Sequence, residues 1–281
     1  MSAWLVAHGA AFRGAAFASV FLAMAMAEVF LEVRPLRVAR RRRWLHNLGL
    51  TLVNTAVLRV VFPIGAVSAA LWADRYGVGL LHLVNWNPAV EIVLSIVILD
   101  LVIYGQHVLF HTVPLFFRFH EVHHADVDFD VTLGTRFHPV ELLLSMAIKL
   151  SAVALLGASA AAVVLFETLL VVTSLFNHAN VRLPDAIDRA LRWVVVTPAM
   201  HAIHHSMERA DRDTNFGFSI PLWDRLFGTY RARSMVSPAV IGMPDHQQGA
   251  LQTLRWMVML PFRIANEPPH PARSGSHQGA A

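Results

Sequence analysis

The stretch AVEIVLSIVILDLVIYGQHVLFH, residues 89–111, is an almost unbroken apolar run that ends in two histidines. A helix needs about 20 apolar residues to cross a bilayer, and residues 89–110 are long enough. His107 and His111 stand four positions apart, so on a helix their side chains lie on one face. The stretch therefore predicts a membrane-spanning helix whose last turn presents two imidazoles.

Other apolar stretches on both sides of this run extend the prediction to a bundle. Residues 14–33 and 45–72 are each long enough to span a bilayer, and Pro63 is expected to kink the second. Residues 139–176 are long enough for two helices, and Gly157 near their middle favours a hairpin that enters and returns. No segment shows the two-residue period of a strand. We expect an all-α, polytopic membrane helical bundle of about four spans.

Composition supports a membrane protein. The 281 residues are 56% hydrophobic and only 15% charged, whereas soluble domains carry roughly 25% charged residues. The densest basic cluster, Arg34, Arg37 and the run from Arg40 to Arg43, follows the first span, which by the positive-inside rule makes that connection cytoplasmic. Basic residues that flank spans indicate topology, and we expect no binding of nucleic acid.

The rest of the chain is assigned by the same arguments. The N-terminus lacks the basic region that begins a signal peptide, and Glu28 interrupts the end of its apolar stretch. We therefore expect a retained span and not a signal peptide. Arginines are frequent after His178, which places that region on the same cytoplasmic side. Residues 251–264 are apolar but too short to span, so we expect an interfacial helix. We expect one domain, residues 1–265, and a disordered tail, residues 266–281.

The histidines carry the chemical signal. The chain has no cysteine, which excludes disulfides and thiolate ligands, but it has sixteen histidines. His120-Glu121-Val122-His123-His124 and His201-Ala202-Ile203-His204-His205 share one spacing, and with His107 and His111 they fall on one predicted membrane face. Eight imidazoles exceed the needs of one ion, whereas two ions with four or five ligands each account for them.

Two alternatives use the same residues. His120-Glu121-x-x-His124 satisfies the H-E-x-x-H signature of an intramembrane zinc metalloprotease or hydrolase, with Glu121 as general base. That site needs only one further ligand and leaves the second cluster unexplained. A non-catalytic metal-binding or transport protein would require polar residues through the membrane midplane, and these are scarce.

These motifs resemble those of the fatty acid hydroxylase / sterol desaturase superfamily. The three histidine boxes are accompanied by Thr197-Pro198-Ala199-Met200, Asn215-Phe216-Gly217 and the segment from Trp223 to Tyr230, and the similarity covers roughly residues 20–235. The resemblance implies a cytoplasmic helical cap that holds a histidine-rich dimetal site, two Fe ions for which Zn can substitute, and O2-dependent hydroxylation or desaturation of a lipid. It implies these metal ligands: His107, His111, His120, His123, His124, His178, His201, His204 and His205.

Several polar residues are expected to support this site. Additional candidates, as ligands or as groups that orient the ligands, are His138, Asp213, Asn215 and Asp224. Asp126 and Asp128 are also candidates for orienting ligand N–H groups. Asp100 and Tyr104 precede the first box on the same predicted span, where a carboxyl group requires a partner or a function.

The resemblance also implies partners. The substrate is expected to be a lipid, a sterol, fatty acyl chain or related molecule, that enters from the bilayer through the span bundle. The chain has no dinucleotide fingerprint, haem-attachment motif or cysteine for an iron–sulfur cluster. An external electron donor of the ferredoxin or cytochrome type is therefore expected, and the arginines of the cap would suit an acidic one.

Overall fold

The computed structural model describes residues 2–235 and 240–263. Every regular element in this part of the chain is a helix, and the β pairing there consists of two isolated bridges, Glu32 with Val181 and Ser206 with Ile241. The predicted all-α class is confirmed.

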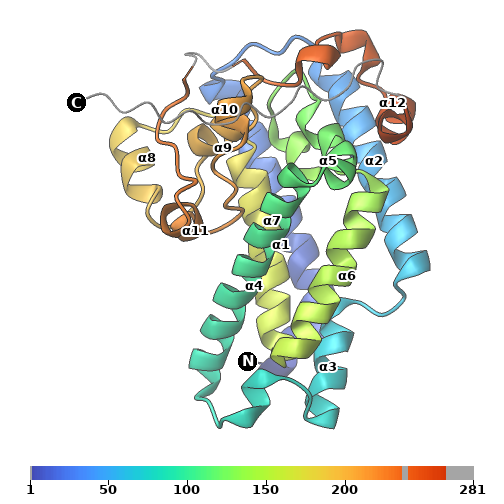
Figure 1. Cartoon of the computed structure of the whole chain (residues 1–281), viewed down its shortest axis with the longest axis vertical. Coiled ribbons are helices and arrows are strands. Elements are labelled where there is room, and N and C mark those ends of the chain that lie inside the picture. Colours follow the sequence, from blue (N-terminus) through green and yellow to red (C-terminus); the bar gives the residue numbers. More distant parts are fainter. Residues whose placement is uncertain (1, 236–239, 264–281) are drawn as a thin grey trace.

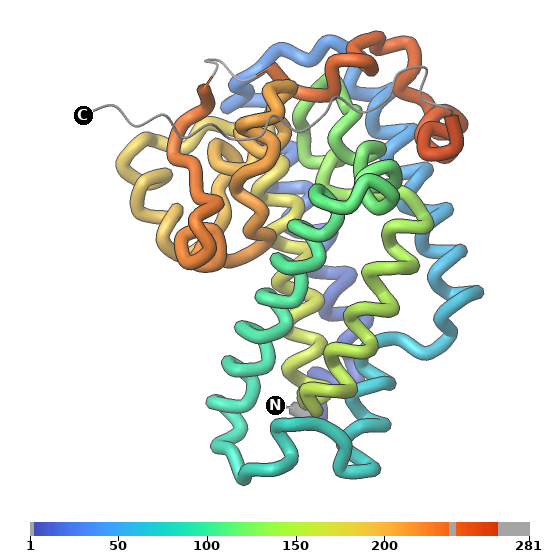
Figure 2. The backbone as a smooth tube through the Cα atoms, in the orientation of Figure 1, coloured from blue at the N-terminus to red at the C-terminus, as the bar shows by residue number. Residues whose placement is uncertain are grey.

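One set of helices forms an elongated bundle (Figure 1). They are α1 (Ser2–Leu31), α2 (Arg40–Val61), α3 (Ala66–Tyr76), α4 (Pro88–Thr112), α6 (Pro139–Leu156) and α7 (Ala160–Asn177). Short helices gather toward one end, as the tube in Figure 2 also shows, and we call them with their loops the cap. They are α5 (Pro114–His124), α8 (Asp185–Leu191), α9 (Pro198–His204), α10 (Arg209–Arg212), α11 (Leu222–Leu226) and α12 (Leu254–Met259).

Local sequence sets the ends of the helices that matter for the site. The side chains of Asn87 and His138 accept hydrogen bonds from backbone N–H groups in the first turns of α4 and α6, and a proline follows each of them at the first helical position. Gly157 ends α6 with a φ of 70°, a left-handed conformation that favours glycine. The predicted hairpin at Gly157 is thus confirmed.

The second predicted span is divided. Residues 62–65, Phe-Pro-Ile-Gly, separate α2 from α3, because Pro63 lacks the N–H that would continue the helix. The first span also differs from the prediction, since α1 begins at Ser2. Arg13, which would otherwise be an isolated charge in that helix, pairs with Glu167 of α7.

Five stretches of the described residues are long and apolar enough to cross a membrane: Ala3–Leu31, Arg40–Leu83, Pro88–Thr112, Pro139–Leu156 and Ala160–Asn177. About four spans were expected. The fifth arises because each arm of the hairpin has 18 residues, about 27 Å of helix, close to the hydrocarbon thickness.

The bundle is apolar inside and outside. Its inner cluster includes Leu99, Ile103 and Phe166, while Leu52 and Val60 are among many large apolar side chains that face outward. A continuous exposed apolar surface of this kind is typical of helices in contact with lipid.

Buried polar contacts attach the cap to the bundle. Glu28 near the end of α1 accepts hydrogen bonds from the backbone N–H groups of Val131 and Asn180. Asp100 of α4 accepts one from the indole of Trp223 in α11, at 2.9 Å. Of the two possibilities that the sequence left for Asp100, a partner or a function, the structure shows a partner. Tyr104, one turn later, contacts Thr229 of the cap.

The C-terminal apolar segment is short, as predicted. Helix α12 and the 3₁₀ turn Leu260–Phe262 pack against α2 and α5 through Trp256 and Met257. The predicted tail, residues 266–281, lies outside the described residues.

Candidate metal centre

The nine histidines predicted as ligands converge on two adjacent groups. The first contains His107, His111, His120, His124 and His204, and the second contains His123, His178, His201 and His205. Within each group the ring nitrogens that face one another all lie within 4.8 Å. No other such group of histidines and carboxylates occurs in the described part of the chain.

Helix geometry explains how the boxes divide. Neighbouring residues on a helix point about 100° apart, so His123 and His124 of α5 face different groups, as do His204 and His205 at the end of α9. His178, which directly follows the last residue of α7, completes the second group. Each H-x-x-H-H box therefore serves both groups and holds them side by side.

The spacing of the nitrogens fits a metal ion in each group. The Nε2 atom of His120 lies 3.2 Å from the Nε2 atoms of His107 and His124. In the second group, the Nε2 atoms of His178 and His201 are 2.9 Å apart. Nitrogen ligands about 2.1 Å from one ion are about 3 Å apart when they subtend a right angle. Neutral imidazoles packed Nε2 to Nε2 can share at most one proton per contact, whereas an ion satisfies every lone pair.

The opposite ring nitrogen of several histidines is held by the protein. The Nδ1–H groups of four rings donate to backbone carbonyls at 2.7–3.1 Å, namely His107 to Phe216, His123 to Arg136, His178 to Ser174 and His204 to Thr214. A carbonyl only accepts, so each of these rings carries its proton on Nδ1 and leaves Nε2 as a lone pair. This is the tautomer that a metal site requires.

Burial also keeps the imidazoles neutral. Burial lowers the pKa of His178 and of His204 to about 3. It lowers the pKa of four other rings in the cap well below the ordinary value: His123, His124, His201 and His205. Neutral imidazole is the form that coordinates metals, so the donor set suits a cation at neutral pH.

The structure brings in a carboxylate that the sequence interpretation missed. Glu141, in the first turn of α6, lies with Oε1 2.7 Å from Nδ1 of His120, and both side chains are buried. An acidic residue in an apolar span, three positions after His138, was the available signal.

The additional candidates affect the site indirectly or not at all. Asp224 accepts hydrogen bonds from the backbone N–H groups of Phe216 and Gly217, and so positions the carbonyl that receives the proton of His107. Asn215, at a φ of 53°, is bonded to the backbone of Met200 and Arg231.

The two remaining candidates, His138 and Asp213, differ in how near they lie to a histidine group. His138 caps α6 and lies outside both groups, so its candidacy as a ligand is not supported. Asp213 is half exposed, with one carboxylate oxygen 3.6 Å from Nδ1 of His111.

The expected roles of Asp126 and Asp128 are wrong. Asp126 pairs with the buried guanidinium groups of Arg43 and Arg136, and Asp128 accepts the backbone N–H groups of Arg37 and Val38. Burial alone raises the pKa of Asp126, but the two arginines hold it below its ordinary value. This network affects the site indirectly, because the backbone carbonyl of Arg136 accepts a hydrogen bond from Nδ1 of His123.

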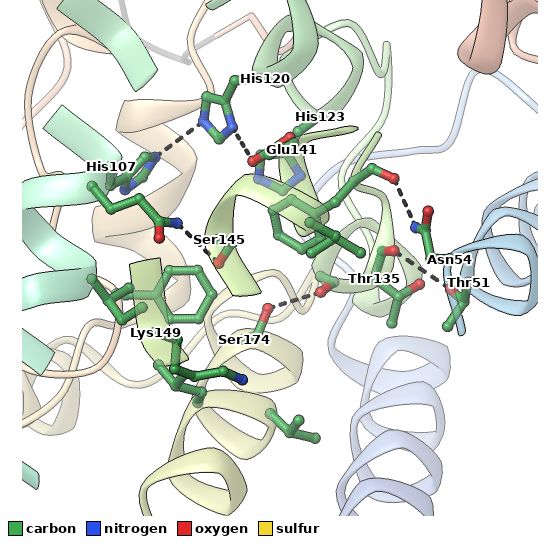
Figure 3. A pocket seen from close by; sticks show the side chains of 18 of the residues that line it. Thr51, Asn54, His107, His120, His123, Thr135, Glu141, Ser145, Lys149 and Ser174 are labelled. Carbon is green, nitrogen blue, oxygen red and sulfur yellow. Dashed lines mark hydrogen bonds and ion pairs between the residues drawn. The ribbon is translucent and has the colours of Figure 1, made fainter. Parts of the chain in front are cut away.

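A cavity of about 380 Å³ connects the two groups with the interior of the bundle. His107 and His120 of the first group and His123 of the second lie at its upper end as drawn in Figure 3, and His201 of the second group also lines it. Side chains of α1, α2, α4, α6 and α7 form most of the remaining wall. The cavity gives a mostly apolar ligand access to both histidine groups.

Comparison with known proteins agrees with this site. The sequence model of the fatty acid hydroxylase family matches residues 92–229. An ornithine lipid hydroxylase, OlsE, of Rhizobium tropici is 29% identical over 67% of this chain and 53% of its own length. Cholesterol 25-hydroxylase of Rattus norvegicus is 29% identical over 68% of this chain and 62% of its length.

Alkylglycerol monooxygenase of Xenopus tropicalis is 26% identical over 45% of this chain and 27% of its own length. The chain thus spans less than two thirds of each of these curated relatives. No solved structure matches it. All three histidine boxes and the segment from Trp223 lie within or at the edge of the matched region, and the chain belongs to the fatty acid hydroxylase / sterol desaturase superfamily.

Proposed function

We propose that this chain is an O2-dependent di-iron oxidoreductase that hydroxylates or desaturates a membrane lipid. The observation that carries the proposal is that members of both histidine groups line a cavity inside a membrane-type bundle. Relatives named as lipid hydroxylases and a monooxygenase support the same reaction class.

The nine histidines would hold two ions, with five ligands in the first group and four in the second. Bound iron supplies one-electron and O2 chemistry, which zinc lacks because its oxidation state does not change. The protein contributes rigid placement of the ligands. Nδ1–H contacts to fixed carbonyls and to Glu141 orient the rings before any ion binds.

The cavity would hold the lipid next to both ions and exclude water from the reacting carbon. Asn54 and Glu141 line it, and each has one buried side-chain oxygen without a hydrogen-bond partner among the described residues. These acceptors would receive donor groups of the substrate and fix its orientation.

We further propose that the cap is cytoplasmic. The basic cluster from Arg34 to Arg43 joins α1 to α2 at the cap end, and positive residues favour the cytoplasmic side. An external donor of the ferredoxin or cytochrome type would supply electrons there. Exposed arginines of the cap, including Arg189, Arg209 and Arg233, are suited to an acidic partner.

The structure disfavours the hydrolase alternative. Glu121 would be the general base of an H-E-x-x-H site. Its Oε1 is instead hydrogen-bonded to Nε2 of His246 at 3.1 Å, and neither residue belongs to a histidine group. A zinc hydrolase would need that carboxylate beside a metal-bound water.

The test is turnover with labelled oxygen. The full chain, loaded anaerobically with Fe(II) in lipid nanodiscs, is given a bacterial lipid extract, a reductant with a ferredoxin, and ¹⁸O2. Mass spectrometry is expected to find a lipid that gained one ¹⁸O atom or lost two hydrogens, and His201→Ala should abolish it. An unchanged lipid profile with both ions loaded would contradict the proposal.

A further inference from the structure

Lys149 is the only lysine in the 281-residue chain. It lies in the middle of α6, a candidate membrane span, and its side chain lines the cavity below the histidine groups. A charged side chain at this depth is costly and usually has a functional partner.

The charges around Lys149 do not balance. Its Nζ lies 2.6 Å from Oε1 of Glu167 in α7, and Nη1 of Arg13 in α1 lies 2.9 Å from the other oxygen of the same carboxylate. Glu167 is the one carboxylate that forms an ion pair with either cation in the described part of the chain. Two cations therefore share one anion within the span region, which leaves one uncompensated positive charge.

The excess charge lies at the far end of a polar row that begins at the metal centre. Glu141, Ser145 and Lys149 are four residues apart, so they lie on one face of α6, and all three line the cavity (Figure 3). Glu141 contacts the ligand His120, and Ser145 contacts Gln106 of α4. Glu141 and Lys149 are eight positions apart, which is about 12 Å along the helix.

We propose that Lys149, supported by Arg13 and Glu167, binds an oxyanion of the lipid substrate, a carboxylate or a phosphate. The inference rests on the proposed function and names its substrate class: an anionic lipid whose anion lies within about 12 Å of the carbon presented to the histidine groups. A second anion beside Glu167 would balance the two cations of the triad, and the otherwise apolar wall would accommodate the hydrocarbon part.

Equilibrium binding tests the site without requiring turnover. Radiolabelled dodecanoic acid, dodecyl phosphate and dodecanol are titrated into the metal-loaded chain in phosphatidylcholine nanodiscs, with empty nanodiscs as background. At least one anionic probe is expected to bind about tenfold more tightly than dodecanol, and the better probe identifies the oxyanion. Lys149→Met should remove this preference, whereas Lys149→Arg should keep it.

Arg59→Met is the matched control, because Arg59 is an exposed cation on α2 outside the cavity. Metal content reports whether each variant is folded. Glu167→Gln frees both cations and is expected to tighten binding of the anionic probe, a gain that general damage would not produce.

Equal affinity for all three probes in the unmodified chain would overturn the inference. So would a preference that survives Lys149→Met, since the anion would then be bound at the metals. A chain that oxidises lipid without an anion preference contradicts only this inference, whereas a chain that binds the anion but never oxidises lipid contradicts only the proposed function.

Discussion

Glu141 Oε1 and His120 Nδ1 are 2.7 Å apart, and both side chains are almost completely buried between α5 and α6. The contact links the cavity wall to the first histidine group, because Glu141 lines the cavity while His120 faces His107 and His124. For an ion bound by the first group, the contact would make the affinity depend on a residue that is not itself in either group.

Glu141→Ala is expected to weaken metal binding in the first group by roughly 10- to 100-fold, the usual effect of losing the partner of a ligating histidine. Glu141→Gln keeps an acceptor oxygen and should lose less. Competition with a chelator, followed by elemental analysis, measures the effect. Glu121→Gln, which alters the neighbour of His120 that contacts His246, serves as the control, and a loss of the same size there would argue against the contact.

Adjacent histidines are expected to have separable effects. His204 belongs to the first group and His205 to the second, although they are neighbours in sequence. Each alanine variant should lower the occupancy of its own group more than that of the other, as Mössbauer spectra of ⁵⁷Fe-loaded protein can distinguish. His138→Ala should retain both ions and cost only about 1 kcal/mol through the lost helix cap. Identical spectra for the first two variants would contradict the division of ligands.

The buried ion-pair network of Arg43 and Arg136 with Asp126 and Asp130 should contribute strongly to stability. Arg43→Met leaves the buried carboxylate of Asp126 with Arg136 as its remaining cation and removes the ion-pair partner that Asp130 has among the described residues, a loss that typically costs roughly 3–5 kcal/mol. Thermal unfolding in detergent, monitored by circular dichroism, is expected to show a large fall in Tm. Arg42→Met is the matched control, because Arg42 is exposed and its side chain donates one hydrogen bond within the described residues, to the carbonyl of Ala250. Equal Tm values for the two variants would be inconsistent with the network.

Filling the cavity should separate catalysis from metal binding. Ser145→Leu places a larger side chain in the cavity wall one helical turn after Glu141. We expect turnover to fall by about tenfold or more with two ions still bound, which corresponds to a rise of about 1.4 kcal/mol in the activation free energy. Ala147→Leu enlarges an exposed residue of the same helix outside this cavity and should have little effect. Unimpaired turnover in Ser145→Leu would show that the substrate does not use this cavity.

Local patterns predicted much of this arrangement. Apolar length identified the long helices and Gly157 identified the hairpin, because these effects operate within a few residues; Pro63 predicted a kink, and the structure has a break between α2 and α3 there. The i, i+4 spacing of His107 and His111 and the repeated boxes likewise predicted that the histidines gather.

Contacts between distant segments were not predictable in the same way. The division of the boxes between two groups depends on how α4, α5 and α9 are rotated against each other, which no local period encodes. Asp126 was expected to hold a ligand, but the sequence contains no sign that Arg43, 83 residues away, would lie against it. Lys149 and Glu167 are isolated charges in apolar stretches until the hairpin brings them together.

Anomalous diffraction at the iron edge, from crystals of the Fe(II)-loaded chain, tests the central claim most directly. Two iron peaks are expected, one surrounded by the imidazoles of the first group and one by those of the second. A single peak, or two peaks away from the Nε2 atoms of His120 and His201, would contradict the assignment of a dimetal centre.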